Sequence, residues 1–391
     1  MGAHSHGHYG HHGFGGGSNR GFEAAKNDIV VLLNSDMRVD PDFLQPLLDG
    51  FHDESVFAVS CQIFFSDPNK LREETGLTQA WWENGGLRVR HRIDDKVQSA
   101  FPCFYGGGGS CAFDRRKFAE LGGFDELLKP FYLEDTDLGY MAWKRGWTVF
   151  YEPRSIVWHE HRGTIGKKFS HEYIQSILKK NFLLFCWKNI HEWPRLFSHF
   201  FFAFAGAWLS VLFGDSFERP NPLALWRAFQ QLPQALKSRA RAQQLAAITD
   251  TEAFRRPMPG YYLDRFETLP KTKERPSVLF LSPYPVCPPI HGGGVFIYQT
   301  LLELVKHCDV HLVILLDEEW QEAAHEELTA KCKTAEYLVR LEGRPKGFGS
   351  LTPFAVREFS NDDLRWAIHR TLLLQKADLD VEQAQRGIIY I

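Results

Sequence analysis

The sequence predicts an α/β protein of two modules that are joined by a helical, aromatic-rich connector. From Phe14 to Asn189, short β-rich runs alternate with helical stretches, as in a layered α/β fold. A second strand–loop–helix–strand succession begins at Ser277. Between the two modules, residues 196–214 carry no charged side chain and are rich in Phe.

The first module, residues 13–190, has strand and helix signals in alternation. Residues 28–33 form a continuous apolar run, which predicts a buried strand. Pro41 suits the first turn of a helix, because its missing N–H costs nothing there. Further strands are expected at 56–64, 148–151 and 155–158, and further helices at 116–122 and 136–145. We therefore expect a mixed, mainly parallel sheet.

The connector, residues 191–254, allows three interpretations. Its uncharged run is close to the roughly 20 apolar residues of a membrane span, and residues 227–256 carry six basic and two acidic side chains. It is either a Phe-rich core helix or a membrane-surface or re-entrant helix with aromatic anchors. A true span is third, because Ser198, His199 and Ser210 interrupt the run. Peripheral membrane contact is thus predicted for residues 195–241.

The second module follows a predicted linker. Residues 255–276 contain four prolines and several charges, which is typical of a linker. Residues 277–282 and 310–316 predict strands, 283–294 a Pro/Gly loop and 295–306 a helix. The module extends over residues 277–391.

Composition excludes several classes of protein. The chain has 45 Lys plus Arg and 48 Asp plus Glu, so it lacks the basic excess of a nucleic-acid-binding protein. Its 7 cysteines form no CxxC pair, which argues against a zinc ribbon and a disulfide framework and favours a cytoplasmic location. The His-rich start, residues 1–12, is either a metal-binding tract or an expression tag or start artefact.

Polar residues follow the first buried strand, where open α/β sheets bind ligands. Asn34-Ser35-Asp36 offers a carboxylate suited to Mg²⁺ or Mn²⁺, although such a tripeptide is usually a turn. His159 and His161 follow a later strand and are either structural or able to complete a metal shell.

Two further motifs are ambiguous on their own. Glu134 and Asp135 precede a helix and are either a general base with its neighbour or acidic residues that complement the helix dipole. Gly106–Gly109 is not a phosphate-binding P-loop, because no GK[ST] ends it. It is either a turn or a place where the backbone approaches a flat ligand such as a sugar ring.

The order of these motifs resembles that of a family-2 glycosyltransferase of the GT-A fold, over residues 13–190. The resemblance rests on GFGGGSNRG, strand-NSD, GGGGSCAFDRRKFAELGGFDE, LEDTDLGYMAWKRGW and VWHEHRGT. It implies a nucleotide-sugar donor, with Asn34 and Asp36 at its diphosphate and Gly107 and Gly108 at the sugar. It also implies a catalytic base at Asp135, with Glu134 beside it. Asp36 and His159 are the metal ligands it implies, for Mn²⁺ or Mg²⁺.

The second module resembles the opening of a family-4, GT-B-fold glycosyltransferase, with a Rossmann-like domain. This rests on SVLFLSPYPVCPPIHGGGVFIYQTLLELV, in which Gly292, Gly293 and Gly294 would form a loop near the donor phosphates. Both modules are expected to be truncated. The first lacks the nucleoside-binding unit that opens the family, and the second lacks the donor-binding half.

The leading hypothesis is an inverting, metal-dependent hexosyl- or rhamnosyl-type transferase of surface polysaccharide biosynthesis. Its acceptor would be a glycan or a lipid-linked glycan. It would act in the cytoplasm, or at the cytoplasmic face of the inner membrane if the connector contacts lipid. The alternative is a catalytically inactive fragment that serves as a membrane-associated carbohydrate-binding or assembly module.

Overall fold

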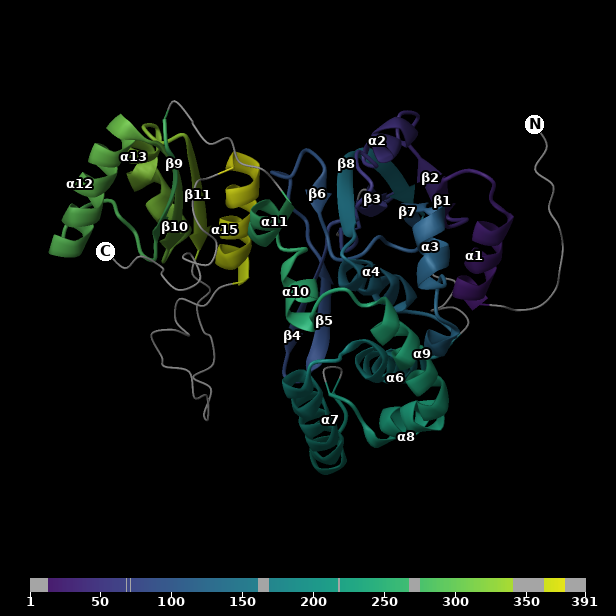
Figure 1. Cartoon of the computed structure of the whole chain (residues 1–391). Helices are drawn as coiled ribbons and strands as arrows, with labels where there is room; N and C mark the ends of the chain where they lie inside the picture. Colours follow the sequence, from purple (N-terminus) through teal and green to yellow (C-terminus); the bar gives the residue numbers. More distant parts are fainter. Residues whose placement is uncertain are drawn as a thin grey trace. The chain divides into compact units, whose positions relative to one another are not determined.

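The computed structural model describes residues 13–67, 69–70, 72–160, 169–216, 219–266, 275–339 and 362–376. The chain divides into two compact units, Met1–Pro257 (unit 1) and Met258–Ile391 (unit 2) (Figure 1). The His-rich start and His161 lie outside the described residues.

Unit 1 contains a six-stranded sheet and a separate two-stranded hairpin. Its strands are β1 (Ile29–Leu33), β2 (Met37–Val39), β3 (Val56–Phe65), β4 (Thr78–Glu83), β5 (Gly86–His91), β6 (Phe101–Pro102), β7 (Ser110–Asp114) and β8 (Thr148–His159). The sheet order is β1-β7-β3-β8-β2, with β6 paired to β8, while β4 and β5 form the hairpin. The two strands predicted at 148–151 and 155–158 are one continuous strand, β8.

The expectation of a mainly parallel sheet is wrong for the described strands. β3 and β8 pair in parallel, whereas β1–β7, β3–β7, β2–β8 and β6–β8 are antiparallel. Continuous apolar runs signal burial on both faces, which is common in parallel sheets. Burial does not depend on strand direction, however, because β3 is buried along nearly its whole length with antiparallel β7 beside it. The prediction of a buried strand at residues 28–33 is also wrong, because β1 is only half-buried.

Helices surround this sheet. They are α1 (Gly13–Ala24), α2 (Leu44–Asp49), α3 (Arg115–Leu121), α4 (Glu134–Arg145), α6 (His171–Asn189), α7 (Trp193–Phe213), α8 (Pro222–Gln230), α9 (Leu232–Leu245) and α10 (Asp250–Arg255), with a 3-10 turn, η1 (Glu126–Leu128). α2 packs on β3 and β8, α4 packs on β8, and α6 packs on α8, α9 and β5. The predicted connector therefore consists largely of α7, α8, α9 and α10.

Aromatic side chains fill much of the unit 1 core. Phe22 of α1 stacks on Phe118 of α3 with 3.7 Å between ring centroids, and Phe113 of β7 meets both rings edge-on. Such pairs contribute about 0.5–1.5 kcal/mol beyond their buried area. The surplus of Phe thus serves the core of unit 1 as well as the connector.

Unit 2 has a parallel sheet of three strands, β9 (Ser277–Ser282), β10 (Asp309–Leu316) and β11 (Thr334–Val339), in the order β11-β10-β9. Its helices are α11 (Pro259–Phe266), α12 (Gly292–His307), α13 (Glu326–Thr329) and α15 (Asp362–Gln375), with a 3-10 turn, η2 (Glu319–His325). Figure 1 shows α12 and α15 on opposite sides of this sheet. Leu312 and Ile314 pack toward the α12 side, and Val313 between them packs toward α11 and α15.

The predicted linker, residues 255–276, contains an ordered helix. α11 belongs to unit 2, where Tyr261 and Leu263 are buried in the same cluster as Leu372 of α15. Pro259 stands at the start of α11, a position where proline favours a helix rather than breaking it. Residues 267–274 lie outside the described part of the chain.

The glycine loop predicted at Gly292–Gly294 is the first turn of α12. His291 precedes the helix, and its imidazole Nδ1 accepts a hydrogen bond from the Gly294 N–H at 3.0 Å. A side chain that accepts from this position caps the helix N-terminus. The three glycines are therefore helical, and the loop ends before them.

Candidate functional site

The turn after β1 lies against the glycine-rich segment that leads into β7. The Asn34 N–H donates to the Gly109 carbonyl at 2.9 Å, continuing the β1–β7 pairing. A Cβ on Gly109 would stand 2.3 Å from Asn34 Nδ2, so a larger residue there would displace the Asn34 side chain. The chain therefore brings together two of the predicted motifs.

Gly108 joins this pair to the acidic start of α4. The Gly108 N–H donates to Asp135 Oδ2 at 3.2 Å, and the Thr136 N–H donates to Asp135 Oδ1 at 2.7 Å. A Cβ on Gly108 would stand 2.9 Å from the ring of Phe14. Gly107 donates to the Ser60 hydroxyl at 3.4 Å and so faces β3 rather than Asp135.

A strained turn places the acidic residues. Tyr132 and Leu133 both have positive φ, 73° and 72°, immediately before α4 begins at Glu134. Two consecutive non-glycine residues in this region cost of order 1–3 kcal/mol each and occur mostly at functional sites. Asn181 of α6 stabilises the turn by donating to the Tyr132, Phe131 and Leu128 carbonyls.

The three carboxylates at the start of α4 have different surroundings. Burial raises the pKa of Glu134 to about 8, and the negative charges of Asp135 and Asp137 add to this effect. Burial also raises the pKa of Asp135, against the hydrogen bonds from Gly108 and Thr136. Within the described chain, Glu134 Oε2 is buried without a hydrogen-bond partner.

Asp137 has a structural role. Its carboxylate accepts from Lys188 Nζ and Asn189 Nδ2, each at 2.6 Å, and Lys188 also contacts Asp125 at 2.9 Å. These contacts fasten α4 to the end of α6. Of the three carboxylates, Asp135 and Glu134 are therefore the two left for chemistry, and they are the two that the sequence singled out.

Asp36 and His159 form a second part of the site. β2 pairs with β8 so that Met37 lies opposite His159, and the Glu160 N–H donates to the Asp36 carbonyl at 2.9 Å. His159 Nε2 lies 3.4 Å from Asp36 Oδ2, and its Nδ1 lies 2.9 Å from Glu74 Oε2. The hydrogen bond to Glu74 is the main cause that raises the pKa of His159, against the effect of burial.

These donors suit a divalent metal in part. A carboxylate and an imidazole are ligands that Mn²⁺ accepts, and Glu74 is placed to orient the ring through Nδ1, as carboxylates do behind metal-bound histidines. Glu74 and Asp36 contact opposite nitrogens of the ring, so they cannot converge on one ion. No group of three or more His, Cys, Asp or Glu side chains suited to a metal occurs in the described residues.

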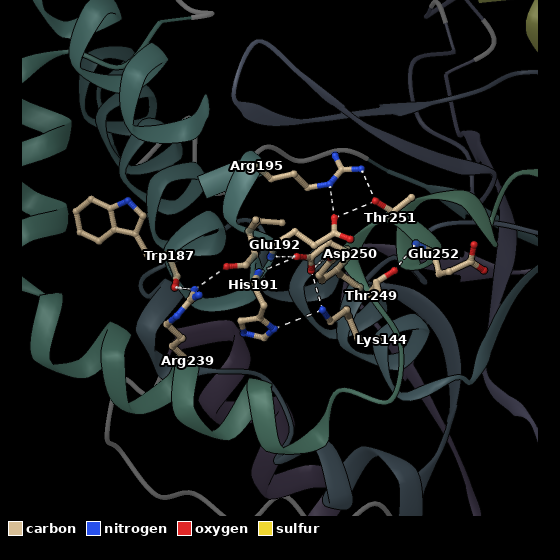
Figure 2. Close-up of polar contacts among 12 residues, drawn as sticks. Lys144, Trp187, His191, Glu192, Arg195, Arg239, Thr249, Asp250, Thr251 and Glu252 are labelled. Carbon is tan, nitrogen blue, oxygen red and sulfur yellow. Dashed lines mark hydrogen bonds and ion pairs between the residues drawn. The ribbon is translucent and has the colours of Figure 1, made fainter. Parts of the chain in front are cut away.

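A buried ionic network was not foreseen from the sequence (Figure 2). Asp250, at the start of α10, accepts from Lys144 Nζ at 2.7 Å and from the Tyr140 hydroxyl at 2.6 Å. Its other oxygen accepts the backbone N–H groups of His191 and Glu192, each at 2.7 Å. The network ties α4 to the α6–α7 junction. The sequence pattern does not reveal this network, because it does not show that Lys144 is buried and its partner Asp250 lies 106 residues away.

The comparisons with known proteins bear on unit 1. Residues 4–175 match the model of the family described as "Glycosyltransferase like family 2". Over these residues, unit 1 is similar to the glycosyltransferases of that family. A mouse polypeptide N-acetylgalactosaminyltransferase 10 is 31% identical over 152 residues, which are 36% of this chain and 25% of that protein. A putative polypeptide N-acetylgalactosaminyltransferase 10 of Drosophila melanogaster is 28% identical over 174 residues, 42% of this chain and 26% of that protein.

The chain therefore spans about a quarter of the length of these curated relatives. Two solved structures are similar at 15% identity. One is GalNAc-T7 with UDP, GalNAc and Mn²⁺, with a TM-score of 0.40 over 66% of this chain and 45% of that chain. The other is the mannosyltransferase PcManGT from Pyrobaculum calidifontis with GDP-Man and Mn²⁺, with a TM-score of 0.30 over 63% of this chain and 66% of that chain.

Proposed function

We propose that unit 1 transfers a sugar from a nucleotide-diphosphate sugar to a glycan or lipid-linked acceptor, with inversion, in surface polysaccharide biosynthesis. The observation that carries the proposal is the convergence of the Asn34 turn, the glycine segment and Asp135. Motifs up to about 100 residues apart in the chain meet at the end of β1. The family match of residues 4–175 supports the reaction class.

Asp135 is the proposed catalytic base. A single-displacement transfer needs one carboxylate that accepts the proton of the attacking acceptor hydroxyl. Burial raises the pKa of Asp135, and a more basic carboxylate accepts a proton more readily. Glu134, with a pKa of about 8, stays largely protonated at neutral pH and limits the negative charge that Asp135 meets.

Asp36 and His159 are the proposed ligands of a divalent metal, Mn²⁺ or Mg²⁺, with Asn34 beside the donor diphosphate. The metal, when bound, would offset the charge of the leaving diphosphate as a Lewis acid. Gly108 brings its backbone N–H to the Asp135 carboxylate, and the Phe14 ring occupies the space that a side chain at this position would need.

A nucleotide-release assay tests this function. The protein is incubated with a panel of UDP-, dTDP- and GDP-sugars, Mn²⁺ and a glycan or lipid-linked acceptor. We expect acceptor-dependent release of a nucleoside diphosphate and a product of inverted anomeric configuration by NMR. Metal-dependent donor binding without release from any donor would instead support the carbohydrate-binding alternative. Absence of both would contradict the proposal.

Membrane contact within residues 195–241 is the second part of the proposal, and α7 is the helix that carries it. α7 is long and apolar enough to cross a membrane by length and composition, yet only 28% of its most apolar window is buried. Its protein-facing side holds mostly small or polar residues, His199, Ala203, Gly206, Ala207 and Ser210. The large side chains face outward, with Trp208 67% and Phe213 73% exposed.

This arrangement is the inverse of a helix on a water-soluble protein, where the apolar stripe faces the core. Small residues at the packing face and large apolar ones outside are usual where the surroundings are lipid. One face of α7 packs on the rest of unit 1 through His199, which contacts Gly85 and Trp187. A helix held in this way lies along a bilayer surface rather than across it.

Sedimentation with anionic lipid vesicles tests the contact. Trp208→Ser should lower the pelleted fraction severalfold, since each buried apolar side chain contributes about 1.5–3 kcal/mol. The matched control is Trp320→Ser, which removes an equally exposed Trp from unit 2. Equal pelleting of the two variants would contradict a membrane role for α7.

A further inference from the structure

A cavity of about 490 Å³ lies between the turn of the β4–β5 hairpin and helices α6 and α7. This size lies within the roughly 300–1,000 Å³ of typical small-molecule sites. It is separate from the candidate catalytic site, and none of Asn34, Asp36, Gly108, Asp135 or His159 lines it.

Apolar side chains line most of the cavity. α6 contributes Leu178 and Phe182, and α7 contributes Phe201, Phe202 and Leu209. Apolar walls that are open to water favour an apolar occupant, because its binding removes apolar surface from water. A hydrocarbon group is therefore the occupant that its walls favour.

Small residues hold the walls of the cavity in position. A Cβ on Gly85, which has a φ of +70°, would stand 2.5 Å from the Ser198 carbonyl oxygen. The hairpin turn therefore touches the backbone of α7 directly. Ala203, Ala205 and Gly206 line the cavity from α7, and larger side chains there would occupy it. The space is thus a result of close backbone contacts rather than of loose packing.

The lining also carries positive charge. It includes Arg88, Lys179 and Arg219 and no acidic residue. Lys179 is paired with Asp215 at 2.5 Å, and Arg88 lies 3.8 Å from Glu83. The Arg219 guanidinium has no hydrogen bond or ion pair with another described residue. An anionic head group on the occupant would meet this charge.

The cavity is continuous with the proposed membrane face. Phe201, Phe202 and Leu209 line the cavity and are also among the exposed apolar side chains of α7. The hairpin also leads to the candidate catalytic site. β4 starts at Thr78, whose hydroxyl donates to the Tyr105 carbonyl just before the glycine segment, and it runs about 20 Å to the cavity.

We propose that this cavity binds the hydrocarbon chain of a single-chain amphiphile with a phosphate head group. This inference rests on the proposed function, in which the amphiphile is the lipid-linked acceptor of the sugar. The cavity holds the chain, Arg219 meets the phosphate, and α7 brings the site to the bilayer surface from which such an amphiphile comes.

Calorimetric titration of the whole protein tests the site, with alkyl phosphates from hexyl to dodecyl below their micelle-forming concentrations. The affinity should rise about fourfold per added methylene along the series, because each methylene leaves water for the apolar walls. Inorganic phosphate alone should not bind, and the matching alcohols should bind more weakly. An affinity that does not rise with chain length, or no binding of any chain length, would overturn the proposal.

A cavity-filling variant and a matched control locate the binding. Ala205→Trp fills the cavity and should weaken dodecyl phosphate at least about tenfold, whereas Val211→Trp adds the same group to an exposed part of α7 and should not. Arg219→Gln, which does not fill the cavity, should reduce the preference for the phosphate over the alcohol. Equal weakening by both Trp variants would overturn the assignment.

Two further experiments complete the test. The first distinguishes a single-chain amphiphile from a two-chain membrane lipid, and the second distinguishes failure of the cavity proposal from failure of the proposed function. Geranylgeranyl phosphate should bind at least about tenfold more tightly than dihexanoyl phosphatidylglycerol, and the reverse order would overturn the single-chain assignment. Ala205→Trp should retain transfer to a soluble acceptor and lose transfer to a prenyl-linked one. If no transfer occurs at all, the titrations still decide the cavity proposal.

Discussion

Single residues in the first turn of α4 show how similar side chains acquire different roles. Glu134, Asp135 and Asp137 lie within four positions of one another, yet of the three only Asp137 pairs with the charge of Lys188 and accepts a hydrogen bond from Asn189. Asp135 receives two backbone N–H groups, and Glu134 Oε2 receives no hydrogen bond within the described structure. Sequence spacing pointed to the acidic turn, but it could not assign these partners, because Lys188 and Asn189 are about 50 residues away.

Asp135→Asn should abolish transfer while it leaves donor binding largely intact. The amide cannot accept the proton of the acceptor hydroxyl, so kcat should fall by about 10²–10⁴-fold. The fold should tolerate the change, because burial already disfavours the charged form of Asp135. Turnover and donor calorimetry on the same preparation measure the two effects. An equal loss of donor affinity and turnover would contradict the assignment of Asp135 as the base.

Glu134 should make unit 1 less stable as the pH rises. Its pKa is about 8 in the folded protein against an ordinary value of 4.5, so between these values the folded state holds a proton that the unfolded state has lost. Each unit of rising pH in this window therefore lowers the free energy of unfolding. Urea unfolding at pH 5 and pH 8 should show a loss of at least about 1 kcal/mol that Glu134→Gln removes. Glu126→Gln, at an exposed carboxylate, should leave the pH dependence unchanged, and a similar effect of both substitutions would refute the prediction.

At the scale of elements, α4 is held by buried charges at both of its ends. Asp137 near its start binds Lys188. Lys144 near its end binds Asp250, and the side chains of Lys144 and Asp250 are only 2% and 0% exposed. Periodicity located α4 and β3 well, because local apolar patterns set them. The pairing of β7 between β1 and β3, and the anchoring of α10 by Lys144, depend on contacts far apart in sequence. Those features could not be predicted from the local pattern.

Lys144→Met should destabilise unit 1 far more than Arg145→Met. Loss of Lys144 leaves the Asp250 carboxylate buried with part of its charge unpaired, which costs about 3–5 kcal/mol. The neighbouring Arg145 pairs with Glu120 at the surface, at 40% and 43% exposure, and such pairs contribute less than about 1 kcal/mol. Urea unfolding of the two variants followed by circular dichroism compares them directly. Similar losses would show that the Asp250 network does not carry the expected energy.

At the scale of the whole molecule, the sequence predicted two α/β modules joined at residues 255–276, and the division between units 1 and 2 falls within that range. The prolines of residues 255–276 suggested a linker, whereas Pro259 begins a helix whose Tyr261 and Leu263 fill one face of unit 2. That face also needs α15, which is about 100 residues further along the chain. The burial of α11 is therefore a tertiary effect that its own composition does not reveal. The proposed catalytic residues, in contrast, all lie in unit 1.

A chain that ends at Pro257 should therefore fold and keep its affinity for the donor. Unit 2 has cores of its own on both faces of the β9–β11 sheet, so its removal should not open the core around β3. The affinity for a UDP- or dTDP-sugar with Mn²⁺ should stay within about threefold of that of the full chain, less than 1 kcal/mol. Calorimetric unfolding should lose the transition of unit 2 and retain that of unit 1. A chain of this length that folds with the unit 1 transition but binds the donor more than about tenfold less tightly would show that unit 2 contributes to the donor site.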